Sequence, residues 1–173
     1  MSQQTKNNMK KIYLEKIVLN MGVGKSGEDV EVAKNALQQI SGKKPSSRNA
    51  KETHRDWGVR KGEPIGAAVT IRNDEAKALL KRLFEAKGNQ AKAKSFDDFG
   101  NYSFGMKEHI DIPGVKYDPQ IGILGLDIAV ILSRPGYNIR VRSKHKAKVG
   151  KSHIITKKEA QDFLTEEFGV QVI

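Results

Sequence analysis

The sequence predicts an α+β domain, in which a mainly antiparallel sheet has helices packed on one face and leaves the other face free. Segments with strand and helix patterns follow in the order strand, helix, strands, helix, strands, helix, and strands grouped between helices favour antiparallel pairing. The 173 residues are enough for one core, and no linker rich in proline, glycine or serine divides them. We therefore expect a single domain over 12–173, preceded by a flexible basic tail at 1–11.

The clearest strand signal lies at 64–72, which has the sequence PIGAAVTIR. One face of this strand is apolar, and the other face carries Gly66, Ala68, Thr70 and Arg72. Small residues let another backbone approach, a threonine hydroxyl forms hydrogen bonds, and an arginine guanidinium pairs with phosphate. The residues alone leave two interpretations open. Either a helix covers the second face and the small residues serve packing, or the face is free to bind a polyanion.

Upstream of this strand, the pattern predicts a strand over 12–21, a glycine-rich turn and a helix. Ser26 and Asp29 have the spacing of a capping box at the start of the helix, and Gly42 is expected to end it. The residues expected to face inward lie at helical spacing: Val30, Ala33, Leu37 and Ile40.

The stretch 45–63 is polar and basic, and here we expect a strand, a mobile loop at about 46–56 and a second strand over 57–60. A helix should follow the strand at 64–72. Its inward-facing residues have helical spacing: Leu79, Leu80, Leu83 and Phe84.

In the second half of the chain, strands are expected over 102–112 and 125–132. A basic extended segment over 138–152 follows them. The last helix should begin with a capping box formed by Thr156 and Glu159, because a hydroxyl and a carboxylate three residues apart satisfy each other's backbone amides.

Composition limits the function more than the fold. The chain has no cysteine, which excludes disulfides, thiolate metal sites and cysteine nucleophiles. Its N-terminal segment lacks the apolar core of a signal peptide, and no apolar run reaches membrane-spanning length. A cytoplasmic protein without a membrane partner is expected. The formal net charge of +11 and the pI near 9.8 favour a polyanionic partner.

The positive charge is concentrated in two groups. The segment 128–158 contains no Asp or Glu, and its basic residues are Arg134, Arg140, Arg142, Lys144, Lys146, Lys148, Lys151, Lys157 and Lys158. The second group surrounds Trp57 and comprises Lys43, Lys44, Arg48, Lys51, Arg55, Arg60 and Lys61. Basic residues around an aromatic side chain suit RNA, whose bases stack and whose phosphates pair. From the sequence alone, Trp57 is either such a stacking residue or a half-buried packing residue.

The alternative function is a nucleotide-binding enzyme that uses the loop Gly22–Gly27, which matches G-x-G-x-x-G between a strand and a helix. This match lacks the acidic residue about 20 positions further on that would hold a ribose. The four histidines have no metal-ligand spacing, and no carboxylate lies in an acid–base or nucleophilic arrangement. We expect no catalytic residue, no metal and no cofactor.

Several motifs resemble the ribosomal large-subunit protein five family in order and spacing. They are KIVLNMGVG at 16–24, ISGKKP at 40–45, RKGEPIGAAVTIR at 60–72, FGNYSFG at 99–105 and GLDI at 125–128. The RPGY turn at 134–137 and the helix start ITKKEA at 155–160 resemble the archaeal and eukaryotic branch of the family.

The resemblance implies a 5S-rRNA-binding protein in the central protuberance of the large ribosomal subunit. The partners it implies are 5S rRNA, large-subunit rRNA, the elbow of P-site tRNA, a neighbouring ribosomal protein that shares 5S rRNA, and a protein of the small-subunit head. The family's 5S contacts match Asn20, Lys43, Trp57, Arg60, Thr70 and Arg72. Charge adds Lys44, Arg140, Arg142 and Lys144 as RNA-binding candidates.

The family's tRNA-facing loop maps to about 46–56, where the basic residues are Arg48, Lys51 and Arg55. Two positions depart from the family's pattern. Lys43 stands where glutamine is common, and Trp57 stands where phenylalanine is common. A lysine has donors only, whereas a glutamine also accepts, so the departure at Lys43 argues against a base-specific role there.

Overall fold

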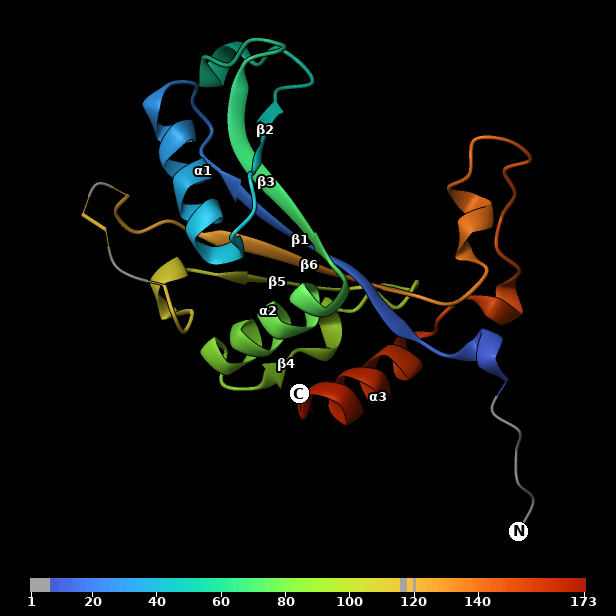
Figure 1. Cartoon of the computed structure of the whole chain (residues 1–173). Coiled ribbons are helices and arrows are strands. Elements are labelled where there is room, and N and C mark those ends of the chain that lie inside the picture. The colour runs from blue at the N-terminus through green and yellow to red at the C-terminus, as the bar shows by residue number, and fades with distance from the viewer. Residues whose placement is uncertain (1–6, 116–117, 120) are drawn as a thin grey trace.

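The computed structural model describes residues 7–115, 118–119 and 121–173, and it has the predicted α+β architecture (Figure 1). Its main sheet has five strands in the order β2-β3-β1-β6-β5, and all neighbouring pairs are antiparallel. These strands are β1 (Tyr13–Gly22), β2 (Ser46–Asn49), β3 (Pro64–Arg72), β5 (Tyr102–Met106) and β6 (Leu126–Ser133).

Helices pack against one face of this sheet. Helix α1 (Glu28–Ser41) packs mainly on β3, and α2 (Asn73–Ala86) packs on β1 and β3. The residues predicted to face inward from both helices are buried, as are the alternate residues of β1: Ile17, Leu19 and Met21. Apolar residues at the helical and strand periods therefore meet in one core, which confirms this part of the prediction.

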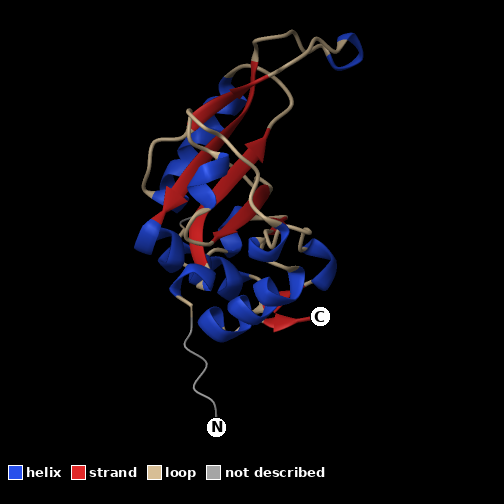
Figure 2. Ribbon diagram, turned by 90° about the vertical axis from the view of Figure 1, so that its right-hand side faces the viewer, coloured by secondary structure: helices blue, strands red, loops and turns tan. Residues whose placement is uncertain are grey.

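Helix α3 (Lys157–Phe168) lies at the C-terminal end of the molecule, where the ring centroid of Phe168 is 6.0 Å from that of Phe84 in α2. A short parallel pair of β4 (Gln90–Ala91) and β7 (Gln171–Val172) fastens the end of the chain. The loop between β2 and β3 lies at the opposite end of the molecule from the C-terminus (Figure 2).

The sequence left open whether a helix covers the second face of β3. In the structure this face is open at the end of the strand that carries Thr70 and Arg72. Thr70 and Arg72 are exposed on it, and Asn20 is partly exposed beside them. Gly66 and Ala68 are buried, and their close contacts are with the neighbouring strands of the sheet. The Ala68 carbonyl accepts a hydrogen bond from Ser46 Oγ at 3.2 Å, and a Cβ at Gly66 would lie 2.6 Å from a backbone oxygen of β1. The small residues thus serve close packing between strands, while the end of β3 that carries the two polar side chains is exposed.

One predicted strand is absent, and another is shorter than predicted. Instead of a strand over 57–60, Arg55–Trp57 form a 3-10 turn and Gly58 takes a left-handed φ of 65°, so that only Val59 pairs back with His54. The strand predicted over 102–112 ends at Met106.

After Met106 the regular pairing with β6 ends, and His109 bonds to the segment just before that strand. The amide of His109 donates to the Leu124 carbonyl, and its Nδ1 accepts from the Leu124 amide at 3.3 Å. His109 is buried by these contacts. The register has slipped by one residue there, because the pairing of Met106 with Leu126 would place residue 108 opposite Leu124, and the segment His109–Asp111 forms a 3-10 turn.

Helix starts follow the sequence in one case and depart from it in another. The capping box of Thr156 and Glu159 is present as predicted. The box of Ser26 and Asp29 is wrong, because Gly27 occupies the N-cap position and no side chain caps α1. Gly42 ends α1 in the left-handed conformation, as expected.

The predicted boundaries of the tail and of the basic extension remain predictions. Residues 1–6 of the tail lie outside the described part of the chain, and Asn8–Lys10 form a 3-10 turn. The extension begins and ends in 3-10 turns at Tyr137–Arg140 and Lys151–His153. Among the residues that the structure describes, no helix has the length and apolar character needed to cross a bilayer.

Tyr102 lies fully buried in an aromatic part of the core, with ring centroids 4.7 Å from Phe96 and 5.2 Å from Phe104. Its hydroxyl accepts a hydrogen bond from Lys87 Nζ at 3.3 Å. Burial raises the pKa of Tyr102 to about 12. Burial, with the nearby charge of Lys92, also lowers the pKa of Lys87.

This burial predicts a specific loss of stability in alkali. The folded-state pKa of Tyr102 exceeds its unfolded value, so the stabilisation is complete below about pH 10 and is lost as the pH rises towards 12. Between these limits the wild-type protein should lose roughly 2 kcal/mol more free energy of unfolding than Tyr102→Phe. The pKa of Lys87 shifts in the opposite direction, but Lys87 is present in both proteins, so the comparison isolates Tyr102. Urea unfolding at a series of pH values measures the difference, and equal losses would contradict the assignment.

Candidate nucleic-acid interface

The sheet face brings together three of the predicted RNA-binding residues. Thr70 lies opposite Val18, and Arg72 lies opposite Lys16, across the β1–β3 pair. The nearest carboxylate to Arg72 is Glu15, whose Oε1 is 3.8 Å from Nη1. An ion pair of that length at the surface is worth less than about 1 kcal/mol. Arg72 can therefore turn to a phosphate at little cost.

Asn20 lies in a different electrostatic setting on the same face. It pairs with Ala68 of β3 on one side and with Asp127 of β6 on the other. Asp127 is exposed. A carboxylate repels phosphate but accepts hydrogen bonds from base amino groups and sugar hydroxyls. The end of the face near Thr70 and Arg72 therefore suits phosphate, and the end near Asn20 suits a base edge or a sugar.

Lys43 and Lys44 follow α1. Lys43 Nζ forms an ion pair with Glu75 Oε2 in the first turn of α2. The Lys43 side chain is 42% exposed, and Lys44 is exposed. An RNA contact by Lys43 has to replace the Glu75 pair, whereas Lys44 presents its ammonium to solvent.

The loop that follows β2 is held by its own backbone hydrogen bonds. The Ala50 amide donates to the Glu63 carbonyl at 2.8 Å, and His54 and Val59 exchange both of their amide bonds. Trp57 at its tip is 73% exposed, and its ring centroid lies 4.8 Å from that of His54. The interpretation of Trp57 as a packing residue is therefore wrong, and its ring is available for stacking.

The basic residues predicted for this region are exposed along the loop and its base: Arg48, Lys51, Arg55 and Arg60. They do not join the sheet-face residues. Arg72 is the last of the nine residues of β3 and lies eight residues from the end of the strand that meets the loop, which is about 26 Å at 3.3 Å per residue. The candidate residues form three surfaces, namely the sheet face, the loop tip and the basic extension.

The basic extension stands off the body next to the end of β6 (Figure 1). Residues 141–148 are exposed throughout, which includes Arg142 and Lys144. Arg140 lies at the base, with its guanidinium carbon 5.2 Å from the centroid of the Tyr137 ring. These exposed cations can reach a polyanion together.

Arg134, which the sequence counts in the same charge run, has a different role. Its side chain is only 4% exposed, and Nη2 lies 2.7 Å from Glu159 Oε1. Its charge is therefore compensated within the protein. Sequence reasoning missed this pair, although the position of Arg134 directly after the buried strand β6 is a signal for burial.

The glycine-rich loop does not offer a phosphate site. The amides of Val23 and Gly24 both donate to the Ile65 carbonyl at 3.0 Å. The first turn of α1 carries three carboxylates: Glu28, Asp29 and Glu31. They interact favourably with the helix dipole and repel phosphate. Two amides of the loop are thus already bonded, and the side chains at the N-terminus of α1 are negatively charged.

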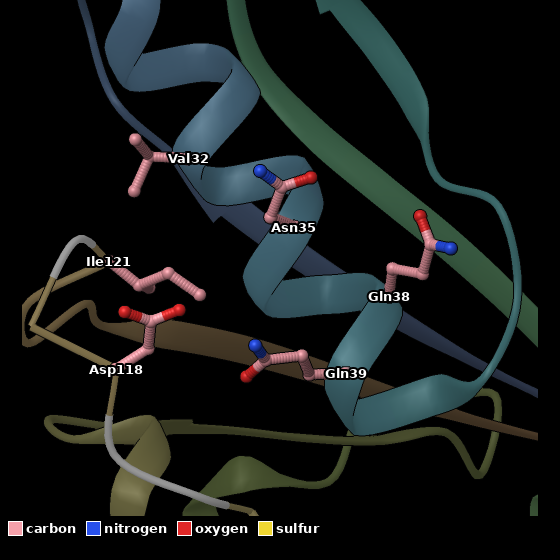
Figure 3. A pocket seen from close by; sticks show the side chains of 6 residues that line it. All are labelled: Val32, Asn35, Gln38, Gln39, Asp118 and Ile121. Carbon is pink, nitrogen blue, oxygen red and sulfur yellow. The ribbon is translucent and has the colours of Figure 1, made fainter.

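A hollow of about 390 Å³ lies between α1 and the segment near residue 121. Carboxamides of Asn35 and Gln39, the carboxylate of Asp118 and the apolar Ile121 line it (Figure 3). None of the described residues that line it is a Lys or Arg, the side chains that usually pair with phosphate. Nor do the described residues gather three or more His, Asp or Glu side chains as metal ligands.

Comparison with known proteins decides the family. Residues 7–60 match the family profile described as ribosomal protein L5, and residues 64–171 match the profile described as the C-terminus of the same ribosomal family. The chain belongs to the ribosomal protein L5 family.

Its relatives in this family include proteins called large ribosomal subunit protein uL5. The one from Nitrosopumilus maritimus is 74% identical over 172 residues, which cover 99% of both chains. The one from Cenarchaeum symbiosum is 70% identical over 96% of this chain and 98% of the relative. The one from Pyrobaculum aerophilum is 51% identical over 95% and 92%.

Membership in the L5 family makes the chain a structural constituent of the large subunit of the cytoplasmic ribosome, associated with rRNA. The family is not enzymatic, so the alternative of a nucleotide-binding enzyme is wrong.

Proposed function

We propose that the chain binds 5S rRNA and large-subunit rRNA in the central protuberance, near the elbow of P-site tRNA and the subunit interface. The observation that carries this proposal is the open sheet face at Thr70 and Arg72. A hydroxyl and a guanidinium stand there side by side, and the ion pair found for Arg72 among the described residues is the loose one with Glu15. That combination suits close docking of an RNA backbone.

On this face, Arg72 pairs with phosphate and Thr70 bonds to a phosphate or sugar oxygen. Asn20, next to Asp127, bonds to a base edge or a ribose hydroxyl of 5S rRNA. Lys44 adds a phosphate contact at the end of α1, and Lys43 adds one when it leaves Glu75.

The loop tip, where Trp57 is exposed, is the second RNA-binding surface of the protein. Trp57 and Arg60 contact 5S rRNA by stacking and phosphate pairing. Arg48, Lys51 and Arg55 face the elbow of P-site tRNA. The position of the loop at one end of the molecule (Figure 2) allows it to reach beyond the sheet face.

The basic extension is the third RNA-binding surface of the protein. Arg140, Arg142 and Lys144 lie along large-subunit rRNA, because a segment without carboxylates binds phosphates without internal competition. The neighbouring 5S-associated ribosomal protein and a protein of the small-subunit head are the expected protein partners, as the family resemblance implies.

The test is the affinity for 5S rRNA against a scrambled RNA of the same length, titrated with salt. If six or more phosphates are neutralised, the logarithm of the association constant should fall with the logarithm of salt, with a slope of about −4 or steeper, for both RNAs. The 5S rRNA should keep an advantage of about tenfold or more at physiological salt. Equal affinities that vanish together in salt would leave only non-specific charge attraction and would refute specific 5S recognition.

A further inference from the structure

The basic extension leaves and re-enters the fold at a single point. It departs after Tyr137 and returns at His153, just before α3 begins. Four side chains join the two ends there, and we call them the clamp: Arg134, Tyr137, His153 and Glu159. None of them is a predicted RNA contact.

Tyr137 is the centre of the clamp. Its side chain is 7% exposed, and its hydroxyl accepts a hydrogen bond from the Ile155 amide at 2.9 Å and donates to the His153 carbonyl at 3.2 Å. The His153 ring in turn lies with Nε2 2.9 Å from the Pro135 carbonyl oxygen. The departing and returning segments of the extension are therefore tied by bonds in both directions.

Arg134 ties the same point to α3. Nη1 lies 3.4 Å from the His153 carbonyl oxygen, and Nη2 pairs with Glu159. Burial pushes the pKa of Glu159 up, but hydrogen bonds from Thr156 and Arg134 outweigh it and leave the pKa below its usual value. Glu159 is thus an anion at neutral pH and also serves the capping box of α3.

The extension is closed a second time further out. The Ala147 amide donates to the Ile139 carbonyl at 3.1 Å, and Arg142 Nε donates to the His145 carbonyl at 2.9 Å. The exposed cations of 141–148 are therefore carried on a loop closed at two levels.

We infer that the clamp is a positioning device, which holds the basic extension in its RNA-binding shape without touching RNA. This inference rests on the proposed function, in which the extension binds large-subunit rRNA. A loop that is already ordered loses less conformational entropy on binding than a loose one. Charge mainly sets the rate of association, whereas preorganisation mainly slows dissociation. Loosening the clamp should therefore speed dissociation and leave association unchanged.

The test variant is Tyr137→Phe, which keeps the buried ring and removes the hydroxyl. We expect its affinity for deproteinised large-subunit rRNA to fall roughly three- to tenfold, through faster dissociation. The amides of Ile155 and Ala147 should exchange hydrogen faster than in the wild type. Tyr102→Phe is the matched control, because it also removes a buried, hydrogen-bonded hydroxyl but lies in the core away from the extension. A change in dissociation of the same size in both variants would overturn the inference.

A second variant separates this inference from the function on which it rests. Replacing the exposed lysines of the loop with glutamine (Lys144, Lys146 and Lys148) tests whether the extension binds rRNA at all, and Arg142 is kept because its Nε bonds to the His145 carbonyl. Wild-type affinity in this variant would refute the RNA-binding role of the extension. A weakened variant, together with unchanged dissociation in Tyr137→Phe, would overturn the clamp alone. If the clamp acts through the loop, adding Tyr137→Phe to the neutralised loop should change affinity by less than about twofold, and a full effect there would also overturn it.

Discussion

Replacing Thr70 and Arg72 together with alanine is expected to weaken binding to 5S rRNA by roughly 30- to 2,000-fold. A hydrogen bond to a charged group contributes about 1.5–3 kcal/mol and a neutral one about 0.5–1.5 kcal/mol, and the two sum to about 2–4.5 kcal/mol. Both side chains are exposed, and the pair between Arg72 and Glu15 is long. The fold should therefore keep its stability within about 0.5–1 kcal/mol. Affinity by fluorescence anisotropy and stability by urea unfolding test both halves of the prediction.

The matched control removes one hydroxyl and one positive charge elsewhere. Ser26 is exposed in the glycine-rich loop before α1, and Lys81 is exposed on α2, which packs on the opposite face of the sheet. Ser26→Ala with Lys81→Ala should lower the affinity by less than about threefold, through general charge alone. Wild-type affinity in a folded Thr70→Ala, Arg72→Ala protein would remove the sheet face from the interface. An equal loss in both double variants would show that only net charge matters.

The sequence could predict the sheet face because the period of a strand assigns each side chain to one of two sides. The alternation in β3 placed Thr70 and Arg72 together before any pairing was known, and the exposure of both is confirmed. What alternation cannot show is which backbone lies against a small residue. Gly66 has the pattern of a residue that admits RNA, whereas its close neighbour is a carbonyl of β1.

Other features depend on partners far away in the chain, which local patterns do not contain. The pair of Arg134 and Glu159 joins residues 25 positions apart, and each taken alone resembles a surface charge. The two-residue strands β4 and β7 are too short to show alternation. The environment of Trp57 was also beyond local patterns, because basic neighbours are compatible with a buried ring and with an exposed one. The structure places Trp57 in a 3-10 turn at the loop tip, where its ring is exposed.

Asp97 illustrates a residue whose role was invisible in the sequence. Its Oδ1 accepts hydrogen bonds from the amides of Phe99 and Asn101, at 3.0 and 2.6 Å. Asp97 thus forms the turn that leads into β5, and its charge needs no partner molecule to explain it. An aspartate three residues before a glycine fits such a turn, but the sequence alone does not distinguish it from an acidic binding residue.

Gly66→Ala is expected to destabilise the fold by about 1–3 kcal/mol, which corresponds to roughly 2–12 °C in the melting temperature of a domain of this size. The added Cβ would lie 2.6 Å from the Met21 carbonyl oxygen and 3.3 Å from the Gly22 Cα. Both neighbours are backbone atoms of β1, so relief requires the two strands to part, and a side-chain rotation does not suffice. Thermal and urea unfolding measure the loss.

Gly105→Ala is the matched control, because it adds the same methyl group to a glycine on the open face of β5. The nearest atom to that Cβ is Asp127 Oδ1 at 3.5 Å, an ordinary contact, so stability should stay within about 0.5 kcal/mol of the wild type. The pair also decides between the two roles of Gly66. If Gly66→Ala kept full stability but lost affinity for 5S rRNA, the small residue would serve the approach of RNA. A loss of stability that Gly105→Ala does not share assigns Gly66 to the contact between β1 and β3, which holds Thr70 and Arg72 in register beside Asn20.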